Sequence, residues 1–328
     1  MFVPAIGYAL LSGLLYALYV VNIKKCGTDR IILFFWVNVL TYVAYLGLYF
    51  FKNIIIKHDL HPVQHLIHDF TLTNVPFYAL MGFFWVGSLL ILNHLLNKHE
   101  LSIVIPITHI GILISTAGYI LLGKQFTNGE IIGKCCIFLG ALLSAYDHVS
   151  LKTLFKSLKK VPGVLLIAAV LDSLFVSGSQ WMTFLCTSKT TITQEILDWA
   201  QDISHHIHGP SFGFHNPFYY NVGVRFFVVL IFLIYIIFFT NLKNKLFPTL
   251  YKKFGQILLI SFFFAGFIIS YHSAFLLFTD RSILVGISKL TVPATLIAGY
   301  WFLGEKITQP KIVGGTLIIC GGLLNVIL

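Results

Sequence analysis

A few charged and polar side chains lie inside long apolar segments, where they are costly. Asp172 occupies the middle of the segment 162–185, with Gln180 two helical turns later and Trp181 beside it. An ionised side chain near the centre of a bilayer costs about 2.5 to 3.5 kcal/mol on insertion scales. We therefore expect Asp172, Gln180 and Trp181 to line a path through the protein interior, with a helix-packing interface as the alternative.

Nitrogen bases and prolines occur together in two other apolar segments, the fourth and the ninth along the chain. Lys289 stands four residues before Pro293, and Pro106 stands three residues before His109. Because proline has no amide hydrogen, the carbonyl group of Lys289 would lose its helical partner and be free to meet a substrate, an ion or water. We expect substrate binding at Lys289 and His109 and gating at Pro106 and Pro293. A structural histidine bonded to neighbouring backbone is the alternative for His109.

Two further side chains are weaker candidates. His272 lies in the eighth apolar segment, and we expect it to hydrogen-bond a substrate or to join helices. Arg225 lies only two turns into the seventh segment, so we expect its guanidinium group to reach the lipid headgroups.

The composition indicates a membrane protein. Of 328 residues, 57% are hydrophobic and 10% are charged, which argues against a soluble enzyme. The formal charge of +10 comes from short loops between apolar runs, so it indicates membrane topology and lipid contact rather than nucleic-acid binding. The five cysteines show no paired spacing, and we expect no disulfide framework, zinc site or cofactor.

The apolar runs predict an all-α polytopic membrane protein with ten transmembrane helices, which we expect in a bacterial inner membrane. The two long connections, 52–75 and 186–218, are expected to hold helices that lie on the membrane surface. The expected spans are 3–21, 31–51, 76–96, 101–122, 130–146, 162–185, 219–240, 254–279, 282–303 and 311–328.

The sequence contains an internal repeat. Residues 118–143 align with 299–324 without a gap, and 11 of the 26 positions are identical. The matched helices are five spans apart, an odd number, so they must cross the membrane in opposite directions. This predicts inverted-topology repeats at 1–147 and 148–328, an arrangement typical of secondary transporters.

These residues resemble the EamA-like branch of the drug/metabolite transporter superfamily. The second half carries a proline in its fourth helix, Leu303-Gly304-Glu305 and then a closing helix with Gly315, Leu317, Ile318 and Gly321. In the first half Pro106, Leu122-Gly123 and the glycines of 133–140 match, but Lys124 stands where the family has an acid. The resemblance implies a ten-helix, two-repeat carrier of small metabolites.

We therefore expect a secondary transporter, not an enzyme, that moves a small zwitterionic or anionic metabolite such as an amino acid by alternating access. A proton or another ion could be coupled to transport, and the chain could act as a monomer or a homodimer in the lipid bilayer. An exporter of amphipathic drugs or lipids is one alternative. A membrane metalloenzyme of the hydroxylase or desaturase type is another, suggested by His58, His61, His65, His68, His205, His206 and His208.

Two arguments about orientation disagree. The odd-numbered connections carry 13 Lys and Arg residues and the even-numbered ones carry 5. The positive-inside rule then places the odd connections in the cytoplasm and both termini outside. The family resemblance implies the reverse.

Overall fold

The described part of the chain is built from helices and contains no strand. The structure, a computed structural model, describes residues 2–26, 30–51, 54, 74–98, 100–108, 112–121, 123–145, 167, 170–171, 174, 217–277 and 289–327. The helices are α1 (Phe2–Lys25), α2 (Arg30–Phe50), α4 (Asn74–Lys98), α5 (Leu101–Thr108), α6 (Ile112–Leu121), α7 (Asn128–Ala145), α11 (Pro217–Phe239), the short 3-10 helix η3 (Lys243–Lys245), α12 (Leu246–Leu277), α14 (Thr291–Leu303) and α15 (Gln309–Ile327).

Six helical stretches in this part of the chain are long and apolar enough to cross a membrane: Pro4–Lys25, Arg30–Phe50, Tyr78–Asn97, Asn128–Ala145, Val222–Phe239 and Lys243–Tyr271. Large apolar side chains are exposed on the outside of the helices, such as Phe238 of α11, which is 75% exposed, and Trp301 of the shorter helix α14, which is 73% exposed. Such surfaces suit a hydrocarbon environment rather than water. The expectation of an all-helical, multi-pass membrane protein is thus confirmed at this level.

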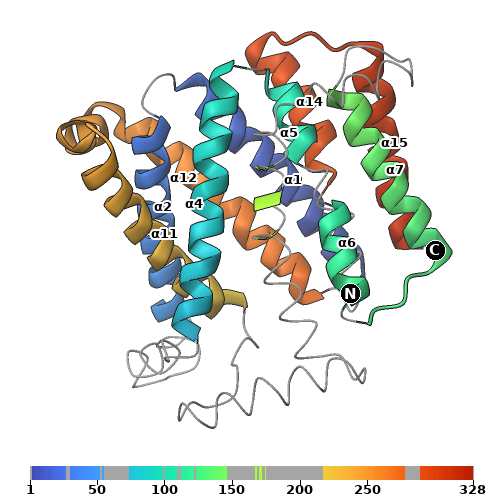
Figure 1. Cartoon of the computed structure of the whole chain (residues 1–328), viewed down its shortest axis with the longest axis horizontal. Coiled ribbons are helices and arrows are strands. Elements are labelled where there is room, and N and C mark those ends of the chain that lie inside the picture. Colours follow the sequence, from blue (N-terminus) through green and yellow to red (C-terminus); the bar gives the residue numbers. More distant parts are fainter. Residues whose placement is uncertain are drawn as a thin grey trace.

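The helices pack into one bundle. Helix α1 contacts both α12 and α14, α11 contacts α2 and α4, and α15 lies along α7 (Figure 1). The large apolar core contains Phe34, Trp85 and Phe264, so aromatic side chains fill much of the space between α2, α4 and α12.

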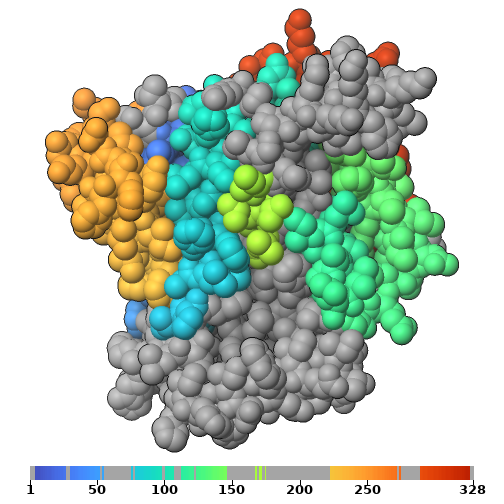
Figure 2. Space-filling view, in the orientation of Figure 1, coloured from blue at the N-terminus to red at the C-terminus, as the bar shows by residue number. Residues whose placement is uncertain are grey.

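Several boundaries differ from the expected spans. The fourth span is described as two pieces, α5 and α6, with residues 109–111 outside the described part. Helix α12 begins at Leu246 rather than at 254, but its backbone leaves the helical conformation at Lys253, just before the expected start. Most of the sixth expected span lies outside the described residues. Its Leu171 lies against Gly87, and Figure 2 shows this short segment beside α4.

A glycine with a positive φ angle follows both α6 and α14. Gly123 and Gly304 occupy equivalent positions, and both have positive φ angles, of 81° and 69°. The amide group of Gly304 donates to the carbonyl group of Tyr300, and the amide group of Glu305 donates to the carbonyl group of Gly299. These glycines close their helices in the left-handed backbone conformation, which is without strain only for glycine.

Candidate functional site

Most of the site residues expected from the sequence lie outside the residues whose side chains are described. His109, Asp172, Gln180 and Trp181 fall outside the described residues, and His272 lies within α12 with only its backbone described. The path expected along Asp172, Gln180 and Trp181 therefore remains a prediction. So does the histidine cluster of the metalloenzyme alternative, all of which lies outside the described part.

Lys289 is buried, with 6% of its surface exposed, two residues before α14. Its carbonyl group was expected to lack a partner, and this was wrong. The amide group of Val292 donates to that carbonyl oxygen at 3.0 Å, because the chain makes a tight turn here. Pro293 is the third residue of α14, within the first turn, where a helix has no internal partner for its amide groups.

Pro106 differs from Pro293 in its position within its helix. It is the sixth residue of the eight-residue helix α5, and it is buried. Proline at this depth cannot donate to the carbonyl group of Ser102, four residues earlier. Of the two expected gating prolines, Pro106 thus breaks the helical hydrogen-bond pattern, whereas Pro293 helps to begin a helix.

The amino terminus of α5 is capped by a residue from the other half of the chain. The carboxylate of Glu305 accepts hydrogen bonds from the amide groups of Leu101 at 2.8 Å and Ser102 at 2.9 Å. The same carboxylate forms an ion pair with Lys24, the Nζ to Oε1 distance being 2.8 Å. A carboxylate satisfies the free amide groups of a helix start and the positive end of its dipole. The acid of the L-G-E turn therefore holds α1, α5 and α14 together.

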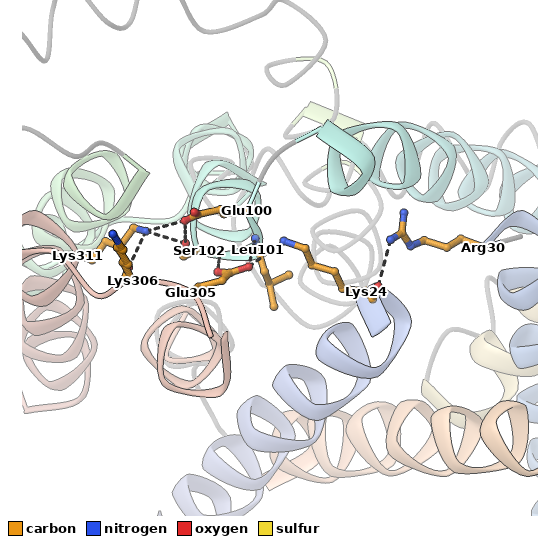
Figure 3. Close-up of polar contacts among 8 residues, drawn as sticks. All are labelled: Lys24, Arg30, Glu100, Leu101, Ser102, Glu305, Lys306 and Lys311. Atoms are coloured by element: carbon orange, nitrogen blue, oxygen red, sulfur yellow. Dashed lines mark hydrogen bonds and ion pairs between the residues drawn. The ribbon is translucent and has the colours of Figure 1, made fainter. Parts of the chain in front are cut away.

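A second cation, Lys311, makes polar contacts at the same end of the bundle. The buried ammonium group of Lys311 donates to the Ser102 hydroxyl at 2.8 Å, the Lys306 carbonyl at 3.1 Å and the Glu100 carboxylate at 3.2 Å. An ammonium group has three N–H bonds, and all three find acceptors here. Figure 3 shows the arrangement, which we call the polar clamp and define as Lys24, Glu100, Ser102, Glu305 and Lys311.

Arg30 extends the polar clamp toward the start of α2. Its guanidinium group donates to the carbonyl groups of Ile23 at 3.3 Å and Lys24 at 3.1 Å, and to the side chain of Asn97. These contacts place the ends of α1 and α4 beside the starts of α2, α5 and α15. The connections that follow α1, α4 and α14 therefore lie at one end of the bundle, as alternating membrane crossings require.

The pKa of Glu305 is lowered from its ordinary value. Burial by itself raises this pKa, but the hydrogen bond from Lys24, those from the amide groups of Ser102 and Leu101, and the positive charge of Lys24 together outweigh it. The carboxylate is therefore held in its charged form.

At the equivalent position in the first half, the charges are exchanged. In the repeat alignment Lys124 corresponds to Glu305 and Glu130 corresponds to Lys311. Lys124 forms an ion pair with Glu130 at 3.1 Å, and Glu130 exchanges hydrogen bonds with Thr127 in a capping box that starts α7. The basic residue that departs from the family pattern thus has an acid of its own half as its partner.

Helices α7 and α15 meet through reciprocal glycine contacts. A Cβ atom built on Gly133 would lie 2.7 Å from the carbonyl oxygen of Gly321, and one built on Gly140 would lie 2.5 Å from that of Gly314. In the repeat alignment Gly133 corresponds to Gly314 and Gly140 to Gly321. Gly133 therefore contacts the counterpart of Gly140, and Gly140 contacts the counterpart of Gly133. The two helices run antiparallel and approach closely because no side chain separates them.

The isoleucine contacts of this interface are exchanged between the two helices in the same way. Gly140 lies against Ile318 while Gly321 lies against Ile137, and Ile137 corresponds to Ile318. Lys134 of α7 also donates to the side-chain oxygen of Asn325 in α15, at 3.1 Å. The Lys134 bond has no counterpart, because Gly315 stands at the equivalent position, but the glycine and isoleucine contacts recur with the partners exchanged, which is the mark of two-fold symmetry.

Arg225 was expected to reach the lipid headgroups, and this was wrong. It is 2% exposed, and it donates from Nη1 to the side-chain oxygen of Asn38 at 2.7 Å. Its Cζ atom lies 5.2 Å from the ring centroid of Trp85 and 4.8 Å from that of Phe264. Depth along a span does not reveal which face of the helix carries a residue. The sequence did hold one signal for the burial of Arg225: Asn38 is a polar residue inside another apolar segment.

Comparison with known proteins adds no assignment. No protein-family model matches the chain, and the search of curated proteins finds no match.

Proposed function

We propose that this chain is a secondary transporter of the EamA-like kind, with two inverted five-helix repeats at 1–147 and 148–328. It moves a small anionic or zwitterionic metabolite by alternating access, and it resides in a cell membrane such as the bacterial inner membrane. The reciprocal glycine contacts of α7 and α15 carry the proposal, because a two-fold relation between antiparallel helices is what inverted repeats require.

Two other observations support it. The L-G-E acid, Glu305, bonds to helices of the first half, which gives this family feature a structural purpose. Arg225 and Lys289 are buried cations inside a bundle whose outer surface is apolar. Ionisable groups within membrane helices usually mark the path of a substrate or ion.

The test is counterflow in proteoliposomes that contain the purified full chain. Radiolabelled amino acids and monocarboxylates are supplied outside, with or without the same unlabelled solute inside. A carrier gives saturable uptake that internal solute accelerates and that needs no ATP. Equal uptake with and without internal solute, for every solute that enters, would exclude alternating access.

Two controls address the alternatives. Rhodamine and a fluorescent phospholipid, offered in the same vesicles, test the exporter of drugs or lipids. Metal content of the purified protein tests the metalloenzyme. Stoichiometric iron together with no solute counterflow would favour the enzyme over the carrier.

A further inference from the structure

A cluster of polar and aromatic side chains surrounds Arg225 inside the bundle. Trp85 of α4 and Phe264 of α12 have nearly parallel rings, with centroids 6.0 Å apart and planes 12° apart, and Arg225 of α11 lies over both. Asn38 of α2 accepts from the guanidinium group. Tyr19 of α1 stacks on Phe264 with ring centroids 4.6 Å apart. Five helices thus converge on one cation.

Two buried hydroxyl groups of this region lack a hydrogen-bond partner among the described residues. The Tyr19 side chain is 1% exposed and that of Thr41 is 0% exposed, and neither hydroxyl oxygen makes a hydrogen bond there. Threonine inside a helix commonly bonds to the carbonyl group four residues earlier, but Thr41 does not. A buried hydroxyl without a partner is costly, so its presence calls for an explanation.

Tyr19 lies close to Arg225, and Thr41 lies on the helix face that carries Asn38, the partner of Arg225. The positive charge of Arg225 acts on the Tyr19 hydroxyl, whose ring packs on the same Phe264 that the guanidinium group covers. Thr41 is one helical turn beyond Asn38, so both lie on the same face of α2. The guanidinium group thus has the Tyr19 hydroxyl near it, and the Thr41 hydroxyl lies on the same face of α2 as its partner Asn38.

We propose that Arg225, Tyr19 and Thr41 bind the carboxylate of a small organic monoanion, with Trp85 and Phe264 holding its apolar body. A planar guanidinium group pairs with a carboxylate through two parallel hydrogen bonds, and hydroxyl donors complete the shell of the anion. A single cation suits a single negative charge better than a doubly charged phosphate. This inference rests on the proposed function and names the substrate class that the carrier takes.

Variants that lack one of the two hydroxyl groups distinguish a role in ligand binding from a purely structural role. If the hydroxyl groups are only buried defects, Tyr19→Phe and Thr41→Val should leave ligand binding unchanged and leave stability equal or higher. If they bind a carboxylate, both variants should keep or gain stability without ligand and yet bind the anion several-fold more weakly. Tyr42→Phe is the matched control, because Tyr42 lies on α2 beside Thr41 but packs on Phe226 instead.

The probes are phenylacetate, its neutral analogue phenylacetamide, and inorganic phosphate. Binding is read as the shift of the thermal unfolding midpoint of the purified full chain. We expect phenylacetate to raise the midpoint, and phenylacetamide and phosphate to have little effect. Arg225→Gln should weaken phenylacetate binding at least about tenfold, and Arg225→Lys, which keeps the charge but not the planar fork, several-fold.

The outcomes distinguish this proposal from the carrier proposal. Should Arg225→Gln fail to assemble, Tyr19→Phe and Thr41→Val still decide. Unchanged phenylacetate binding in both of these variants, or equal stabilisation by the neutral amide, overturns the carboxylate site while leaving transport of another solute possible. Binding that depends on Arg225 and Tyr19, without counterflow of any solute, keeps the site and overturns the carrier.

Discussion

The ammonium group of Lys24 lies 2.8 Å from the carboxylate of Glu305, although 281 positions separate the two residues along the chain. Glu305 also caps α5 through two amide groups, so one carboxylate connects the end of α1, the start of α5 and the end of α14. This ion pair belongs to the polar clamp, and its partners come from both proposed repeats.

Neutralising Glu305 should therefore destabilise the protein. Glu305→Gln should lower the unfolding free energy by about 1 to 3 kcal/mol, because hydrogen bonds to a charged group are replaced by neutral ones. Lys24→Met should lose less, since the capping bonds remain. A double-mutant cycle on both positions should give a coupling energy of about 0.5 kcal/mol or more. Additive effects would show that the ion pair contributes no stability beyond that of the capping hydrogen bonds.

The lowered pKa of Glu305 predicts a dependence of stability on pH. Since the pKa is lower in the folded protein than the ordinary value of 4.5, the charged carboxylate contributes its stability fully above about pH 5. That contribution is lost as the pH falls below 4.5 and through the folded-state pKa. The unfolding midpoints of the protein and of Glu305→Gln should converge at acid pH. A constant difference down to pH 3 would contradict the assignment.

The glycine contacts predict a position-dependent cost for one methyl group. Gly133→Ala and Gly140→Ala should each destabilise the protein by about 1 to 3 kcal/mol, because the added carbon overlaps the backbone of α15. Gly7 and Gly255 are the matched controls, since nothing lies within 4 Å of a Cβ atom built there. Alanine at these two positions should be neutral or stabilising by up to about 1 kcal/mol. Denaturant titration in mixed micelles measures both sets, and equal costs in both would refute close packing.

The two prolines should differ in their effect on transport. Pro106→Ala restores an amide donor inside α5 and should slow counterflow while expression holds. Pro293→Ala changes the first turn of α14, where no such donor is needed, so it should have little effect. Equal loss in both variants would restore the simpler expectation that both prolines gate.

Orientation can be decided by labelling. Lys24, Lys25, Lys306 and Lys311 all lie at the end that carries the polar clamp. The positive-inside rule places that end in the cytoplasm. A cysteine introduced by Lys306→Cys in a chain otherwise free of cysteine should then resist an impermeant maleimide in intact cells and react after permeabilisation. Reaction in intact cells would favour the opposite orientation.

Periodicity and the internal repeat predicted what depends on local sequence. The repeat alignment placed Gly123 opposite Gly304 and Gly133 opposite Gly314, and the structure gives these glycines matching roles: the first two have positive φ angles, and Gly133 and Gly314 both lie in the α7–α15 contact. Features that depend on contacts between segments far apart in the sequence were missed. The capping of α5 by Glu305 could not be foreseen, since nothing local to either segment encodes it.

The errors have specific physical causes. Arg225 was placed by its depth along a span, but burial depends on the direction of the side chain, which Asn38 and two aromatic rings determine. The carbonyl group of Lys289 was expected to be free because Pro293 was assumed to lie inside a helix. Its effect on hydrogen bonding depends on where α14 begins, and α14 begins only two residues before the proline.

The packing of α7 on α15 limits how the bundle can move. Sliding one helix along the other by a single residue would bring residues that carry a Cβ atom onto the backbone that Gly133 and Gly140 now approach. Both glycine contacts would be lost together, whereas a small rotation about their common point would preserve both. If the two repeats rock against each other, the α7 and α15 contact is therefore the pivot, and the travel of the other helices should increase with their distance from it.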